Sequence, residues 1–412
     1  MKGLDTIKKS LKNNTMIYIL IAVAIFFEVL IQAGGKGSLL SPDNVNNIIN
    51  QNAYVVILAT GMLLCILTGG NIDLSVGSIV CLVGAFAGTF IINLGWPVLP
   101  TILLCLIIGI LVGAWHGFWI AFVNIPPFIC TLSGMLLWRG VSLLILNGMT
   151  ISPFPKSYMN IFASYLPDLF LEQPTDEMSN DIYYALVDKN ERITLIVTLL
   201  VAVAICALII VLAVIGRTSK KKKGYNVPNL TSFIVKNVII CALIMALGYL
   251  LGKSQGIPIV LILVAVIVVA YSYFTQNNVP GRYLYAIGGN KKAAELSGVN
   301  TKNVMFFAYT NMGFLSGVAA LVVAARLNSA APTAGQNYEM DAIASCFIGG
   351  ASAYGGTGTV GGAVIGAVFM GILNNGMSIL GVDMNWQRAI KGLVLLLAVI
   401  FDVVSKKRKS SK

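Results

Sequence analysis

Charged side chains inside apolar segments are the residues of this chain best placed for chemistry. Arg139 lies near the middle of one apolar run, and Glu28 and Asp73 lie in or beside two others. A charge at membrane depth is costly, so it requires an ion partner or a wet surface. We expect Arg139 to pair with Glu28 or Asp73, either as a structural ion pair or as part of a transport pathway. Arg388 and Lys391, in the last apolar run, are expected to extend outward toward water.

The residue types needed for catalysis or metal binding are sparse. The single histidine, His116 in AWHGFW, is expected to be a packing residue, and the chain has neither an H-E-x-x-H motif nor paired carboxylates in an apolar run. The seven cysteines all lie in apolar segments, none in a C-x-x-C pair, and are expected to be buried small hydrophobes. We therefore predict no catalytic residue, no metal site and no cofactor.

Two glycine patterns resemble nucleotide-binding loops only superficially. The segment GYLLGKS at 248–254 is one residue short of a Walker A loop, and GTGTVG at 356–361 fits G-x-G-x-x-G. Both motifs need a preceding strand. Neither segment follows a predicted strand, so we expect no phosphate cradle in this chain.

The composition indicates a membrane protein. The chain has 412 residues, of which 57% are hydrophobic and 11% are charged, against roughly 25% charged residues in soluble domains. Apolar runs of span length recur throughout, which predicts an all-α polytopic fold with about twelve transmembrane helices. The predicted spans are approximately 16–33, 53–69, 73–94, 98–121, 128–147, 193–215, 233–251, 256–275, 303–325, 341–351, 359–377 and 386–404.

The basic residues indicate orientation rather than nucleic-acid binding. The net charge is +12, and its lysines and arginines cluster at both termini and in a few loops, as cytoplasmic segments do. With twelve spans, the termini and the basic segments at 217–223 and 282–302 all fall on the cytoplasmic side. The acidic loop at 150–192 falls outside.

Two segments interrupt the apolar pattern with glycines and polar residues. They are LTGGNIDLSVGS at 67–78 and IGGASAYGGTGTVGG at 348–362. Irregular backbone at membrane depth is tolerated where it is buried in protein or lines a wet cavity. For the first segment, Asn71 and Asp73 favour a functional role. For the second, the G-x-x-x-G pairs of Gly358, Gly362 and Gly366 leave close helix packing as the alternative.

A short polar segment, YAIGGNKKAAELSGVN at 285–300, lies between two long apolar runs. We predict a short helix here, capped by Asn290 at its start and ended by Gly298. Such a helix is too short to be stable alone. On the cytoplasmic side it would serve as a contact for a separate protein, although an ordinary structured loop is the alternative.

Five segments resemble motifs of the ribose/xylose/galactoside permease family, and they follow one another along the chain in the family's order. The members of this family are the membrane subunits of bacterial ABC sugar importers. The five segments are YAIGGNKKAAELSG, LTGGNIDLSVGS, NIPPFICTLSGMLLWRG, AARLNSAAPTAGQNYEMDAIASCFIGGASAYGGTGTVGG and GILNNGMSILGVDMNWQRAIKGLVLLLAV, and they cover about residues 50–147 and 256–404. The family core has ten spans. The chain departs from it by an insertion at 150–252, a pattern similar to the long branch of xylose and multiple-monosaccharide permeases.

The resemblance implies a domain organisation for the whole chain. Residues 1–412 would form a single permease domain, with spans 1–5 in 1–149 and an acidic extracytoplasmic loop at 150–192. An inserted helix pair with a basic cytoplasmic loop would occupy 193–252. The remaining spans, with a coupling loop at 285–300, would fill 253–412.

The resemblance also implies partners and site residues. The partners would be an ATPase subunit with two nucleotide-binding cassettes, an extracytoplasmic sugar-binding protein, a second copy of the chain and the lipid bilayer, without nucleic acid. The residues expected to contact the ATPase are Gly288, Gly289, Asn290, Lys291, Lys292, Glu295, Leu296, Ser297 and Gly298. The residues expected along the translocation pathway are Asn71, Asp73, Ser75, Asn374 and Asn375.

These observations predict a permease subunit, not itself an enzyme, that imports a pentose or hexose across the bacterial cytoplasmic membrane. An ion-coupled carrier should contain a mid-depth relay of carboxylates or histidines, and Glu28 and Asp73 are poorly connected in the sequence. Three alternatives remain: an ion-coupled secondary carrier, a permease of the same family for a nucleoside or autoinducer, and, more distantly, a membrane enzyme.

Overall fold

The computed structural model describes residues 15–171, 180–225, 227 and 229–410. Lys2, Lys8, Lys9 and Lys12, which contributed to the predicted orientation, lie outside the described residues. So do the acidic residues Glu172, Asp176 and Glu177 of the predicted outer loop.

The described chain is helical, as predicted, with only isolated bridges between extended residues. The helices in order are α2 (Thr15–Ala33), α3 (Pro42–Leu67), α4 (Val76–Gly88), the π-helical turn η1 (Thr89–Asn93), α5 (Val98–Ala121), α6 (Pro127–Leu146), α7 (Lys156–Phe162), the 3₁₀ turn η2 (Leu166–Leu169), α8 (Asn180–Lys222), α9 (Leu230–Gly252), α10 (Ile259–Asn277), α11 (Val279–Gly289), α12 (Lys291–Leu296), α13 (Thr301–Leu327), α14 (Tyr338–Ile348), α15 (Val360–Ile379) and α16 (Met384–Ser410).

Ten helical segments in the described ranges are long and apolar enough to cross a membrane, which confirms a polytopic helical membrane protein. The other two predicted spans correspond to α14 and α16. With 11 residues, α14 extends about 16 Å, half of a hydrocarbon core of about 30 Å. Helix α16 is 27 residues long, and Arg388, Lys391 and Asp402 interrupt its apolar face.

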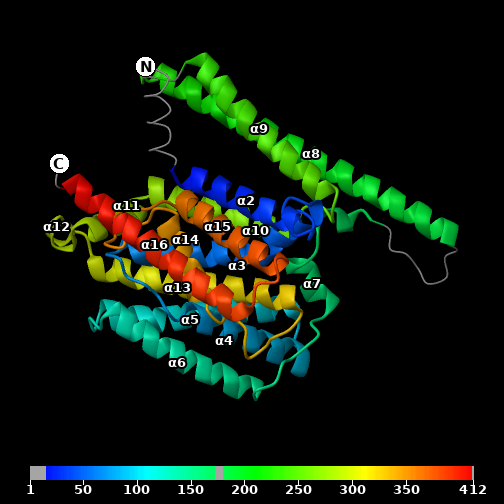
Figure 1. The fold of residues 1–412 in the computed structure, drawn as a ribbon. Helices are drawn as coiled ribbons and strands as arrows, with labels where there is room; N and C mark the ends of the chain where they lie inside the picture. Colours follow the sequence, from blue (N-terminus) through cyan, green and yellow to red (C-terminus); the bar gives the residue numbers. More distant parts are fainter. Residues whose placement is uncertain (1–14, 172–179, 226, 228, 411–412) are drawn as a thin grey trace. The chain divides into compact units, whose positions relative to one another are not determined.

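The chain forms two compact units. The described residues of the first lie within Met1–Leu39, Ile48–Ala163 and Val260–Lys412, and those of the second within Leu40–Asn47 and Ser164–Ile259. The second unit contains the hairpin of α8 and α9, which pack along each other (Figure 1). Helix α8 has 43 residues and begins 13 positions before the predicted span at 193.

The first unit is built around α3 and α13, whose central residues are fully buried. Small residues allow the neighbouring helices to approach closely. A Cβ at Gly313 of α13 would collide with the carbonyl oxygen of Gly109 in α5, and one at Gly113 would collide with Tyr309. Helix pairs in membranes commonly associate through such small residues.

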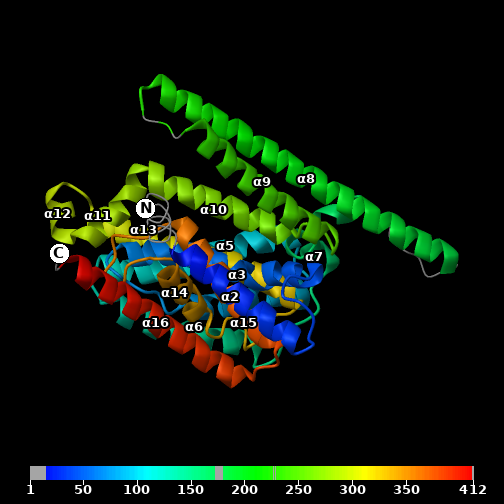
Figure 2. The ribbon, with the colours of Figure 1, turned by 45° about the horizontal axis from the view of Figure 1, so that its top comes forward.

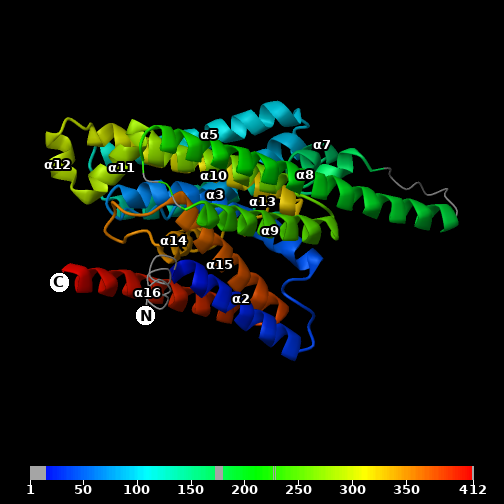
Figure 3. The same cartoon turned by 90° about the horizontal axis from the view of Figure 1, so that it is seen from above.

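The remaining helices of the first unit surround this centre. Figure 3 shows α2 and α16 on the side opposite α5, with α3 and α14 between them. Helices α11 and α12 lie at one end of the unit, where α16 also ends, and α7 lies at the other end (Figure 2). The predicted cytoplasmic loop and the C-terminal helix end are therefore at the same end of the unit.

Both predicted interruptions are present. Helix α3 ends at Leu67 and α4 begins at Val76, while α14 ends at Ile348 and α15 begins at Val360. The second interruption also packs tightly. A Cβ at Gly366 would collide with the carbonyl of Ser345 in α14, and one at Gly362 would collide with Gly349. These glycines therefore serve helix packing, the alternative that the G-x-x-x-G spacing had left open.

Candidate functional site: a short polar helix connected to two helix interruptions

The polar segment at 285–300 contains the end of one helix and a second, shorter helix. Residues 285–289 continue α11, and the short helix predicted to begin at an Asn290 cap is α12. Asn290 breaks the helix with an extended backbone, φ −161° and ψ 101°, and caps α12 by accepting a hydrogen bond from the Ala293 amide at 3.0 Å. Helix α12 then covers Lys291–Leu296.

The end of α12 is also fixed as expected from its residue types. Gly298 has φ +86°, a left-handed conformation that suits glycine, and its amide donates to the Glu295 carbonyl at 3.0 Å. The Glu295 carboxylate accepts from the Thr301 hydroxyl at 2.8 Å. Asn300 caps α13 through the Asn303 amide at 3.1 Å. The turn between α12 and α13 is therefore braced on both sides.

The exposed face of α12 is available for contact with another protein. Lys291 and Lys292 are exposed, and Leu296 is 86% exposed, whereas Ala294 is buried. The apolar residues of the helix thus include an inward alanine and an outward leucine. Leu296 and the two lysines are therefore the side chains that a partner protein would meet at this helix.

Helix α11 rests directly on both interruptions. A Cβ at Gly288 would collide with the Leu67 carbonyl oxygen, where α3 ends, and with the Gly356 amide of the second interruption. The Gly356 amide donates to the same Leu67 carbonyl at 3.1 Å. Gly288 therefore allows three backbone segments to meet at one point, with no side chain between them.

A second bond joins α11 to the interruption between α14 and α15. The Tyr285 hydroxyl donates to the Gly358 carbonyl at 3.0 Å. Burial raises the pKa of Tyr285, so the hydroxyl keeps the proton that it donates. The two interruptions also contact each other, because a Cβ at Gly70 would collide with the Ala353 carbonyl.

The first interruption is braced by a buried polar chain. The Asp73 carboxylate accepts from the Ser75 amide at 2.8 Å and from the Ser75 hydroxyl at 2.6 Å. Ser75 Oγ lies 3.4 Å from His116 Nδ1, and His116 Nε2 lies 3.2 Å from Trp138 Nε1. Indole N–H only donates, so Nε2 is the acceptor and a neutral His116 carries its proton on Nδ1. The expected packing role of His116 is confirmed.

The predicted pathway residues differ in their surroundings. Asp73 is 1% exposed and Ser75 is fully buried, whereas Asn71 is partly exposed and donates to Thr68 Oγ1 at 3.1 Å. Asn374 and Asn375 lie on α15, which packs on α2 and α14, and Asn375 is buried. Their role along the pathway stays a prediction.

The expected partners of Arg139 were wrong. Its Nη1 donates to the carbonyl oxygens of Pro332 and Ala334 at 3.2 and 2.6 Å, in the segment between α13 and α14. Glu28 instead accepts from the Ser38 hydroxyl and the Leu39 amide, each at 2.7 Å. A loop that returns into the helical unit supplies carbonyl groups of its own, so no acidic side chain is needed.

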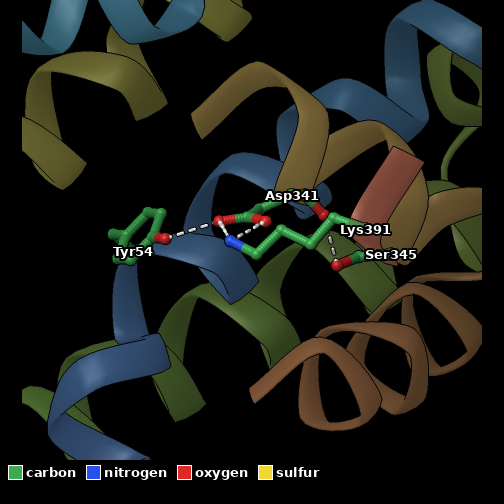
Figure 4. Close-up of polar contacts among 4 residues, drawn as sticks. All are labelled: Tyr54, Asp341, Ser345 and Lys391. Atoms are coloured by element: carbon green, nitrogen blue, oxygen red, sulfur yellow. Dashed lines mark hydrogen bonds and ion pairs between the residues drawn. The ribbon is translucent and has the colours of Figure 1, made fainter. Parts of the chain in front are cut away.

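Lys391 does not extend to water, contrary to expectation. It forms an ion pair with Asp341 of α14 at 3.0 Å, and the Tyr54 hydroxyl of α3 donates to the same carboxylate at 2.7 Å (Figure 4). The Asp341 and Lys391 side chains are only 3% and 21% exposed. Asp341 was not identified from the sequence because it begins a predicted span. The available signal was one acidic and one basic residue in the predicted spans 341–351 and 386–404.

The comparisons with known proteins agree with the motifs. A family model described as "Branched-chain amino acid transport system / permease component" matches residues 44–171 and 181–399. No solved structure matches the chain.

The relatives are permease proteins of similar length. The xylose transport system permease protein XylH of Escherichia coli (strain K12) is 35% identical over 397 residues, 96% of this chain and 93% of that protein. The XylH protein of Haemophilus influenzae is 35% identical over 96% of this chain and 98% of its own. The ribose import permease protein RbsC of Escherichia coli (strain K12) is 32% identical over 89% of this chain and 88% of its own. The chain therefore belongs to the branched-chain amino acid transport system / permease component family, together with these permease proteins for xylose and ribose.

Proposed function

We propose that this chain is the membrane-spanning subunit of an ABC importer that moves a monosaccharide, a pentose or hexose, across the bacterial cytoplasmic membrane. The observation that carries the proposal is similarity to xylose permease proteins over 96% of the chain. Similarity to ribose permeases over 88 to 89% of the chain supports the same class of solute.

The chain is not itself the enzyme, and a separate ATPase subunit with two cassettes supplies the energy. The ATPase contacts α12 through Lys291, Lys292 and Leu296, which are exposed. Only one residue, Asn290, separates α12 from α11, so a displacement of α12 is transmitted to α11. At Gly288, α11 contacts the backbone of both interruptions. Interruptions are the flexible points of a membrane helix, because their backbone is not held by a continuous helical ladder. ATP binding therefore alternates the pathway by moving α4 and α14 at these points.

Two further partners complete the importer. An extracytoplasmic binding protein selects the sugar and delivers it to the outer mouth of the permease. A second copy of the chain provides the other half of the pore, so that two α12 helices meet the two cassettes. Residues 1–412 act as one permease domain, in which the hairpin at 193–252 is an addition to a ten-span core.

The test is uptake of radiolabelled D-xylose by proteoliposomes that contain the chain, its ATPase and its binding protein. ATP-dependent accumulation of xylose, competed by D-ribose and not by adenosine, supports the proposal. Accumulation of adenosine alone would favour the alternative solute class. Accumulation driven by an ion gradient without ATP would favour a secondary carrier.

A further inference from the structure

A polar cavity of about 310 Å³ lies in the first unit. Its size is in the range of roughly 300–1,000 Å³ typical of small-molecule sites. Its polar lining comes from four helices or their starts: Ser78, Arg139, Gln336, Asn337, Glu339 and Arg388. The exposed face of α12 and the buried chain around Asp73 do not share these residues.

Several of the lining groups have hydrogen-bonding capacity to spare. Arg139 uses only Nη1 for its two carbonyl bonds, and among the described residues no hydrogen bond engages its Nε or Nη2. In the described part of the chain, the side-chain amides of Gln336 and Asn337 also form no hydrogen bond. Glu339 is only 8% exposed, yet within the described ranges no ion pair joins it to Arg139 or Arg388. The Glu339 carboxylate can therefore accept further hydrogen bonds from a ligand in the cavity.

The chemistry of these groups selects a class of ligand. Two guanidinium groups disfavour a metal cation, and the Glu339 carboxylate disfavours an anion. A hydrocarbon would leave every polar group unpaired. Hydroxyl groups both donate and accept, so a neutral polyol can satisfy arginine, carboxylate and amide groups together.

The cavity wall is connected to the two helix interruptions. Ser78 lies in the first turn of α4, directly after the first interruption, and its hydroxyl donates to the Met135 carbonyl of α6 at 2.8 Å. The adjacent Gly77 meets Gly335 backbone to backbone, since a Cβ at either glycine would collide with the other residue's carbonyl. Helix α14 runs from the cavity to the second interruption. The cavity wall therefore contains residues of α4 and α14, the helices that adjoin the two interruptions.

We propose that this cavity is a binding site for a monosaccharide inside the permease, where the sugar's hydroxyls contact Arg139, Gln336, Asn337 and Glu339 during passage. The proposal rests on the proposed function and specifies where the sugar is held. A site of this kind binds weakly, because a tight site would retain the solute.

The test is sugar protection of a cysteine placed in the cavity wall of the complete complex. Met135→Cys lines the cavity, and its alkylation by a water-soluble maleimide is measured without nucleotide against the unsubstituted complex. D-Xylose should slow the alkylation, and the same concentration of L-proline should not. Asn337→Gly is the second variant, because Asn337 has φ +64° and glycine accepts this backbone without strain. It should raise the half-protecting xylose concentration about three- to tenfold, the effect of a lost hydrogen bond.

Three results would overturn the proposal: no alkylation of Met135→Cys, equal protection by proline and xylose, or protection that Asn337→Gly leaves unchanged. Its failure can be told from failure of the proposed function, which would appear as a lack of ATP-dependent xylose uptake by the unsubstituted complex.

Discussion

The ion pair between Asp341 and Lys391 connects α14 to α16 and, through Tyr54, to α3. Removing one member of a buried pair costs about 3–5 kcal/mol, because the other charge remains buried without a partner. Asp341→Asn and Lys391→Met should therefore each lower the thermal unfolding midpoint of the purified protein strongly. The double variant should recover much of the loss.

The exposed pair of Arg192 and Asp188, at 2.7 Å with side chains 75% and 60% exposed, provides the matched control. Exposed pairs contribute about 0–1 kcal/mol, so Asp188→Asn should change the midpoint little. Equal effects at the two sites, or a double variant as unstable as either single variant, would contradict a stabilising role for the buried pair.

Gly288 and Gly289 form a natural pair for testing the contact between α11 and the interruptions. A Cβ at Gly288 collides with backbone, whereas a Cβ at Gly289 has nothing within 4 Å. Gly288→Ala should reduce ATP-driven xylose uptake at least about tenfold, because the added methyl would lie 1.9 Å from the Leu67 carbonyl oxygen and overpacking of this kind costs about 1–3 kcal/mol. Gly289→Ala should leave uptake near the unsubstituted level. Equal uptake by both variants would contradict the role of Gly288.

At the scale of elements, α12 is the part that local sequence rules predict best. Its cap at Asn290 and its end at Gly298 follow from residue preferences that act within a single turn. The start of α12 at Asn290 was predicted by the same rules. That Tyr285–Gly289 belong to the preceding helix α11, which runs from Val279 to Gly289, was not predicted.

Features that involve distant elements could be predicted only where unusual residue types inside an apolar run indicated them. The interruptions followed from glycines and polar residues inside apolar runs. The carbonyl partners of Arg139 could not be inferred, because every residue has a backbone carbonyl and the residue type does not show which one is used. Asp341 and Lys391 are separated by 50 positions, and their proximity depends on how α14 and α16 pack.

The turn after α12 gives a test at the same scale. Gly298→Pro forces φ to about −65° where the structure has +86° and removes the amide that bonds Glu295. We expect uptake to be abolished while membrane insertion persists. Gly298→Asn is the control, because asparagine tolerates the left-handed region. Wild-type uptake by the proline variant would show that the turn does not matter.

Two variants of Glu295 separate the effect of its charge from the effect of its hydrogen bond. Glu295→Lys removes the acceptor for Thr301 and reverses the charge on the face proposed for the ATPase, so uptake should be lost. Glu295→Gln keeps an acceptor oxygen and should retain most uptake. The comparison is made by xylose uptake and by co-purification of the ATPase. If the glutamine variant lost both xylose uptake and co-purification with the ATPase, the negative charge of Glu295, and not its hydrogen bond, would be the essential property.

At the scale of the whole molecule, the proposed importer depends on a partner for energy. Purified and reconstituted alone, the chain should not accumulate xylose against a gradient under any imposed ion or pH difference. Addition of the ATPase, the binding protein and ATP should restore accumulation. Uphill uptake by the chain alone, measured with the same radiolabelled sugar, would refute the dependence on an ATPase.

The position of the buried pair along the chain has a consequence for biogenesis. Asp341 leaves the ribosome before Lys391, so the nascent protein holds this acid without its cation until α16 packs against α14. We expect a chain truncated before α16 to be recognised as unfinished and degraded by membrane quality control, with a half-life in pulse-chase far below that of the full chain. If Asp341→Asn does not lengthen the life of that truncated chain, the acid is not the degradation signal.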